Sequence, residues 1–212
     1  MEWGKLAYLL AIIVVGYLPY KTLQRIRPHG LGDISKTTAF LLFIWFLILS
    51  IILFLQTDEK IIVTSPTTVP IAVVTTLLWF FSPYLIRKIG TYPTAVIAEN
   101  QKWFVIRFEP KTLYLKYVEV LFQQVKFLYL IFVVFGALTM GDRVLWFTLL
   151  VGLLHLGNVF FLSTHTAMIF FILSLPMGVL FGMLMLNGYI LVTIAIHLWF
   201  YLLFGGWYWL RR

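Results

Sequence analysis

The sequence has no cysteine and few charged residues. Its 212 residues include 16 Lys and Arg and 8 Asp and Glu, so 11% of the chain is charged, against about a quarter in a soluble domain. The absence of cysteine excludes a thiol nucleophile, an iron–sulfur cluster and a cysteine-ligated zinc site. The hydrophobic fraction of 62% is more than the interior of a soluble fold of this size can hold, and it excludes a disordered chain. We therefore predict a membrane protein and attribute its net charge of +8 to basic loops, with no nucleic acid as partner.

Runs of about twenty apolar residues separate the clusters of charge, and a helix of this length crosses the hydrocarbon core of a bilayer. We predict an all-α fold, a polytopic transmembrane helical bundle with about seven spans, in which residues 1–212 form a single integral membrane domain. The expected spans are 3–20, 39–55, 69–86, 117–138, 144–162, 166–187 and 189–209.

The loops between these spans differ in charge. Basic residues outnumber acidic ones in the 20–38 and 87–116 loops, whereas the 56–68 loop carries two acidic residues and one lysine. Because loops rich in Lys and Arg stay in the cytoplasm, we expect the N-terminus outside the cell membrane and the arginine-tipped C-terminus inside. Within the second basic loop, residues 94–108 are predicted to form either a short hairpin or an interfacial helix.

The fourth predicted span contains the charged residues Glu119 and Lys126, with Gln123 between them. Their spacing of i, i+4 and i+7 places all three side chains on one helical face. Because an ionisable group exposed to lipid costs several kcal/mol, we expect this face to point into the bundle or into a watery cavity. The alternative is a polar seam that only holds helices together.

Two histidines lie near the middle of other spans, His155 in the fifth and His197 in the seventh. Together with Glu119 they can serve as a general base, a polarising group and an oxyanion donor. The same three residues can also form a three-ligand metal site, or each histidine can simply be hydrogen-bonded within the packing. A zinc motif of the H-E-x-x-H kind is absent, and every aspartate falls in a predicted loop, which excludes an aspartyl dyad.

Three short stretches resemble, in order, the motifs of one family of intramembrane proteases. Residues 117–125 (YVEVLFQQV) resemble E-E-x-x-F-R, residues 150–158 (LVGLLHLGN) resemble F-x-x-x-H, and residues 187–201 are similar to a polar break followed by H-x-x-x-N. These are motifs of the CPBP family, the CAAX prenyl protease type II and bacteriocin-processing enzymes. The resemblance covers about 110–205, half of the chain, and it implies a CAAX-protease-like helical fold.

The resemblance implies roles for three residues and the loss of others. Glu119 matches the second glutamate of the first motif. In the family the leading glutamate and the histidine of the second motif activate water, so His155 would keep this role and Glu119 would have to substitute for the leading glutamate, while His197 would stabilise the oxyanion. Four positions depart from the motifs: Val118 replaces the leading glutamate, Gln123 the arginine, Val151 the opening aromatic residue and Tyr201 the final asparagine. Loss of a general base costs about 10²–10⁴ in rate, and loss of an oxyanion donor about 10²–10³. The resemblance thus favours the fold and impaired catalysis.

Three functions follow as alternatives. The first is a pseudoenzyme that keeps the protease scaffold and acts as a binding or accessory subunit for another membrane protein. The second is an active intramembrane peptidase that uses Glu119, His155 and His197 on a membrane-embedded peptide. The third is a small transporter or proton-conducting bundle with Glu119, Lys126 and the histidines as a relay. No cofactor is expected, although a metal at Glu119, His155 and His197 stays open, and the further candidate site residues are Gln123, Lys126, Asn158 and Tyr201.

Overall fold

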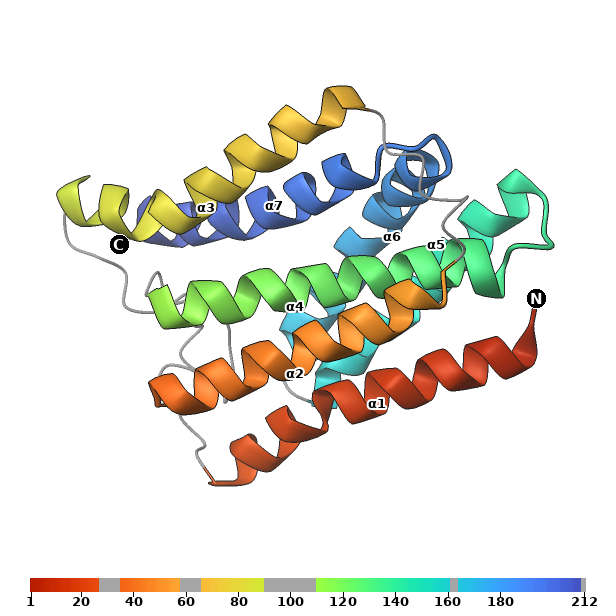
Figure 1. Ribbon diagram of the computed structural model, residues 1–212, viewed down its shortest axis with the longest axis horizontal. Coiled ribbons are helices and arrows are strands. Elements are labelled where there is room, and N and C mark those ends of the chain that lie inside the picture. The colour runs from red at the N-terminus through yellow and green to blue at the C-terminus, as the bar shows by residue number, and fades with distance from the viewer. Residues whose placement is uncertain (27–34, 58–65, 90–109, 161–163, 211–212) are drawn as a thin grey trace.

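The computed structural model describes residues 1–26, 35–57, 66–89, 110–160 and 164–210, and every regular element in these ranges is helical (Figure 1). The all-α prediction is confirmed for this part of the chain, and the hairpin or helix predicted at 94–108 lies outside it. The helices are α1 (Trp3–Ile26), α2 (Lys36–Leu55), η3 (Pro66–Thr68), α3 (Val69–Ile89), α4 (Pro110–Leu128), the π-helix η4 (Tyr129–Val134), α5 (Met140–Leu156), η5 (Gly157–Phe160), α6 (Thr164–Leu186) and α7 (Ile190–Leu210).

Four helical segments in the described residues are long and apolar enough to cross a membrane by length and composition. They are Trp3–Leu23, Lys36–Leu55, Leu113–Val134 and Ala167–Leu186. Two shorter apolar helices, Pro66–Ser82 and Ile190–Leu203, accompany them. The protein is thus a helical bundle with four candidate spans, and the count of seven stays a prediction.

Helix α4 occupies the centre of the bundle. In Figure 1 it runs between the α1–α2 pair and the α3–α7 pair. Within its membrane-length window 67% of residues are buried, against 22–33% in the other three candidate spans. A helix that is mostly buried can carry polar residues on several faces with little exposure to lipid, so α4 is the element on which a site can be built.

The helices alternate in direction. The C-terminal ends of α1, α3 and α7 and the N-terminal ends of α2 and α4 meet at one end of the bundle, on the left in Figure 1. The Lys21 ammonium at the end of α1 donates to the Phe160 carbonyl at 3.2 Å, which ties the end of η5 to the end of α1. The segments that flank the two basic loops therefore lie on the same side of the molecule.

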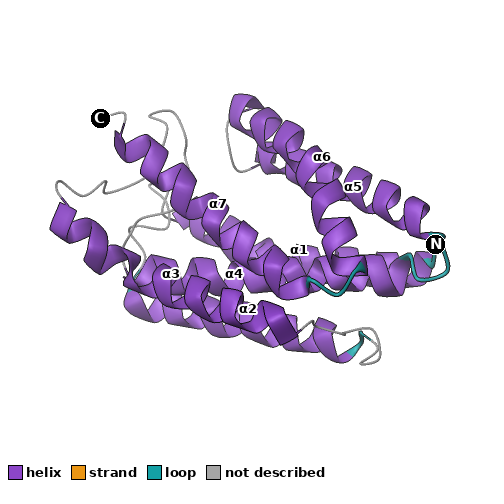
Figure 2. Ribbon diagram, turned by 90° about the horizontal axis from the view of Figure 1, so that it is seen from above, coloured by secondary structure: helices purple, strands orange, loops and turns teal. Residues whose placement is uncertain are grey.

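Helices α5 and α6 lie side by side as a hairpin (Figure 2). Their close approach depends on Gly178 and Gly182, a G-x-x-x-G pair on α6. A Cβ atom at Gly178 would lie 3.0 Å from the Thr148 Cα, and one at Gly182 would lie 3.3 Å from the Phe147 ring. Glycine at these two positions lets the two backbones pack directly, which suits helices in lipid, where association depends on van der Waals contact.

The polar break that precedes the last helix is a helix-terminating turn. Gly188 has φ of 81°, a left-handed conformation that favours glycine. The Gly188 and Tyr189 amides donate to the carbonyls of Met185 and Leu184 at 3.1 and 2.8 Å, which satisfies the end of α6. The turn reverses the chain within three residues and starts α7 at Ile190, the helix that carries His197.

Candidate functional site

Glu119 lies inside the bundle and forms an ion pair on its own helix. Its Oε2 atom is 3.0 Å from the Lys116 ammonium, one turn earlier on α4, and accepts a 3.4 Å hydrogen bond from the Tyr20 hydroxyl of α1. The Lys116 and Glu119 side chains are only 7% and 8% exposed. A buried carboxylate of this kind is stabilised by an adjacent cation and a hydrogen-bond donor, and Glu119 has both.

The sequence predicts Lys116 as the last residue of the 87–116 loop, and this is wrong, because in the structure Lys116 is part of helix α4. Helix α4 begins at Pro110, and proline is favoured at the first position of a helix because it has no amide hydrogen to satisfy. Lys116 is therefore in the second turn, with 6% of its surface exposed. Its ammonium lies 4.5 Å from the centre of the Tyr201 ring of α7, so one lysine contacts both Glu119 and α7.

Further along the same face, Lys126 and Gln123 both contact Tyr17 of α1. The Lys126 ammonium donates to the Tyr17 hydroxyl at 3.1 Å and lies 4.6 Å from the centres of the Tyr17 and Phe122 rings. The Gln123 amide donates to the same hydroxyl at 3.5 Å. The face formed by Glu119, Gln123 and Lys126 thus points toward α1. The helical spacing predicts the shared face, and the packing of the bundle determines which helix it meets.

The opposite side of α4 carries a second polar cluster. The Gln124 amide nitrogen lies 2.8 Å from the His197 Nδ1 atom, and its oxygen accepts a 2.8 Å hydrogen bond from the Thr193 hydroxyl. All three side chains are 9% exposed or less. Because the amide donates to Nδ1, the His197 proton is assigned to Nε2, the neutral tautomer. Gln124 thus connects α4 to two turns of α7.

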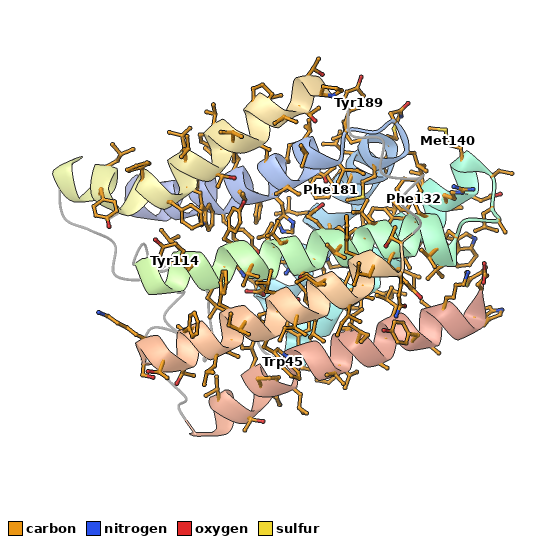
Figure 3. All side chains as sticks on the ribbon, viewed as in Figure 1. Trp45, Tyr114, Phe132, Met140, Phe181 and Tyr189 are labelled. Atoms are coloured by element: carbon orange, nitrogen blue, oxygen red, sulfur yellow. The ribbon has the colours of Figure 1, made fainter. Side chains whose placement is uncertain are left out.

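His197 is enclosed by aromatic rings. The Tyr201 ring stacks on the imidazole with centroids 5.4 Å apart and an angle of 14° between planes, and the Phe181 ring, labelled in Figure 3, lies 6.0 Å away. Because Lys116 contacts the same Tyr201 ring, Tyr201 joins the Glu119 ion pair to the His197 cluster. The position that holds asparagine in the CPBP motif is therefore occupied here by Tyr201, whose ring packs on His197.

His155 has a local partner. Its Nδ1 atom is 2.8 Å from the carbonyl of Val151, four residues earlier on α5, which is an ordinary bond within a helix. Val118 and Val151, which occupy two of the altered motif positions, are 0% and 3% exposed and belong to the same hydrophobic core cluster. Asn158 falls in η5, and its side chain is outside the described part of the chain.

The three candidate catalytic residues have different hydrogen-bond partners, and the Tyr201 ring contacts both His197 and the lysine that pairs with Glu119. Glu119 is paired with Lys116 and Tyr20, His155 with a backbone carbonyl, and His197 with Gln124. Within the described ranges, no three His, Asp or Glu side chains form a group that could hold a metal ion. The arrangement is that of three helices, α1, α4 and α7, held together by buried polar contacts.

Several residues of this site were not singled out from the sequence. Lys116 lies three residues before Glu119, on the same face of α4 as Glu119, Gln123 and Lys126. Its spacing therefore indicates a place in the site, provided that α4 begins before residue 117. Tyr17 and Tyr20 count as apolar in a hydropathy pattern, so the sequence does not indicate that their hydroxyl groups form hydrogen bonds with side chains of α4. Gln124 and Thr193 are single polar residues whose meeting depends on how α4 and α7 pack.

The described residues thus form a helical bundle with four candidate membrane spans and a buried polar network around its central helix. Comparison of the chain with protein-family models, curated proteins and solved structures gives no match. The CPBP membership that the three motifs predict therefore stays a prediction, carried by the sequence of those motifs alone.

Proposed function

We propose that the chain is a seven-span protein of the cell membrane, with its N-terminus outside and its C-terminus and two basic loops in the cytoplasm. The alternation of helix directions supports this topology, because it brings the segments flanking both basic loops to one end of the bundle. The excess of lysine and arginine in those loops assigns that end to the cytoplasm.

Cysteine labelling tests the topology, since the natural chain has no cysteine. Gly4 and Lys36 are both exposed and lie at opposite ends of the bundle. In intact cells an impermeant maleimide should label Gly4→Cys and should label Lys36→Cys only after permeabilisation. The reverse pattern, or labelling of both in intact cells, would contradict the proposed orientation.

The function proposed for this bundle is binding, as an accessory subunit of another membrane protein, on a scaffold of the CPBP kind that has lost catalysis. The observation that carries it is the separate engagement of Glu119, His155 and His197. A water-activating pair needs its base and polarising group within reach of one water, about 3 Å from each. A carboxylate paired with a lysine and a histidine hydrogen-bonded along its own helix are arranged for packing. The valines at positions 118 and 151 supply no replacement base.

A cleavage assay tests this function against the peptidase alternative. The purified natural protein, in lipid vesicles, should leave a panel of transmembrane peptides intact over many hours, because the leading glutamate position holds Val118. The double variant Val118→Glu and Tyr201→Asn serves as the restored comparison. Cleavage by the natural protein that is abolished by both Glu119→Ala and His155→Ala would overturn the proposal and establish an active peptidase.

A further inference from the structure

The membrane-length window of α4, Leu113–Val134, holds two lysines and one carboxylate. Lys116 and Glu119 neutralise each other at 3.0 Å. Lys126 is therefore left as an excess positive charge within the central helix. A lone cation inside a membrane is costly, and such charges are normally paired with another side chain or face a functional path.

Within the described ranges, no carboxylate lies within 4.0 Å of Lys126. Its contacts are the Tyr17 hydroxyl and the faces of two rings. In the sequence, Glu119 is the only acidic residue inside a predicted span. The remaining seven are Glu2, Asp33, Asp58, Glu59, Glu99, Glu109 and Asp142. The described part of the chain thus places no carboxylate in contact with Lys126.

The Tyr17 hydroxyl oxygen beside Lys126 accepts hydrogen bonds from two donors. An ammonium has three N–H donors, and one of them is used on the Tyr17 hydroxyl. The Gln123 amide donates to that same oxygen, which leaves the Tyr17 hydroxyl hydrogen free to turn toward another acceptor. A lysine, an amide and a phenol that share one oxygen form a surrounding suited to an incoming anion.

This cluster reaches the surface of the bundle. Tyr17 and Gln123 are partly exposed, whereas Lys126 behind them is 6% exposed and has a flexible four-carbon stem that can extend past them. Lys126 is the fourteenth residue of the 22-residue window, about 20 Å from its inner end. Lipid headgroups lie at the ends of such a window, so an anion at this depth comes most directly from another membrane-embedded chain.

We propose that the surface formed by Tyr17, Gln123 and Lys126 binds a transmembrane helix of a partner protein through an acidic side chain in the middle of that helix. This inference rests on the proposed binding function and names the chemistry of its partner. The partner carboxylate pairs with the Lys126 ammonium and accepts hydrogen bonds from the Tyr17 hydroxyl and the Gln123 amide. In the complex, α4 then takes part in two ion pairs, the existing pair of Lys116 with Glu119 and a new pair of Lys126 with the partner carboxylate.

The test uses a synthetic transmembrane helix as the probe. A peptide of about twenty Leu and Ala residues carries one central Glu, and its matched control carries Gln. Energy transfer from a dye at Gly4→Cys of the full chain to a dye on the peptide reports association in phosphatidylcholine vesicles. The natural protein should bind the Glu peptide about tenfold more tightly than the Gln peptide, which is the scale of a single strong polar contact between helices in a membrane.

Two lysine variants locate the effect. Lys126→Gln should remove the preference for the Glu peptide, whereas Lys5→Gln, a change at an exposed lysine in the first turn of α1, should keep it. Equal binding of the two peptides to the natural protein would overturn the inference without any variant being needed. A preference that survives Lys126→Gln, or one abolished by adding phosphatidylglycerol, would also overturn it, the latter in favour of a lipid anion.

The state of the peptide separates this inference from the function on which it rests. Mass spectrometry of the recovered peptide shows whether it is intact. A cleaved peptide contradicts the proposed binding function, whatever its affinity. An intact peptide that binds without regard to Glu or Gln contradicts the partner chemistry alone.

Discussion

Glu119→Gln is expected to lower the free energy of unfolding by about 3–5 kcal/mol, the usual cost of removing one partner of a buried ion pair. The substitution keeps the shape of the side chain but leaves the Lys116 ammonium, 6% exposed, without its counter-ion. The Tyr20 hydroxyl loses a charged acceptor at the same time. Unfolding of the protein in mixed detergent micelles measures the change.

The first ten residues contain a matched control for that prediction. Glu2 and Lys5 form an ion pair with the same spacing of three residues, but their side chains are 48% and 46% exposed. Glu2→Gln should change stability by less than about 1 kcal/mol, as is usual for exposed pairs. The double variant Lys116→Met and Glu119→Gln removes both buried charges and should recover most of the loss. A Glu119→Gln variant as stable as the natural protein would show that the pair is not a structural element.

Gln124→Leu is expected to cost about 1–3 kcal/mol, because it leaves the His197 Nδ1 atom buried without its donor. Thr193 is affected less, since its hydroxyl keeps the Ile190 carbonyl at 2.7 Å as an acceptor. The loss should therefore arise mainly from the histidine. The change in the free energy of unfolding is measured in the same experiment. A fluorescent probe near the start of α7 reports the unfolding of that helix.

The neighbouring glutamine is the control for this second prediction. Gln123 is partly exposed and makes one long hydrogen bond of 3.5 Å to Tyr17, so Gln123→Leu should change stability by less than about 1 kcal/mol. The two substitutions have the same chemistry and differ in the face of α4 on which they fall and in the burial of the side chain. Equal effects from both would contradict the assignment of Gln124 as the link between α4 and α7.

The positions of the helices follow from the sequence because each apolar run is near the length of a membrane span and is bounded by polar residues. The turn at Gly188 is predictable for a similar reason, since Asn187 and Gly188 interrupt two apolar runs. The start of α4 at Pro110 is readable too, since proline suits the first turn of a helix. The burial of Lys116 is not, because Lys111 and Lys116 look like loop charges. Lys116 is buried only because Glu119 and the Tyr201 ring of another helix accept it.

The site was predictable in part. A spacing of i, i+4 and i+7 places Glu119, Gln123 and Lys126 on one face of α4 whatever that helix packs against. Which helix receives this face depends on tertiary packing, and the choice of Tyr17 and Tyr20 has no counterpart in a hydropathy pattern. Gln124 follows Gln123 by about 100° around the helix, which turns it toward α7 and His197.

The central claim is that Glu119 and His197 are engaged in separate contacts that join helices. A cryo-electron microscopy map of the protein in a lipid nanodisc, with a bound antibody fragment to add mass, tests it directly. The expected result is Glu119 Oε2 within about 3 Å of the Lys116 ammonium and His197 Nδ1 within about 3 Å of the Gln124 amide. A map in which Glu119 turns away from Lys116 and shares one water with His155 and His197 would contradict the account and indicate a catalytic centre.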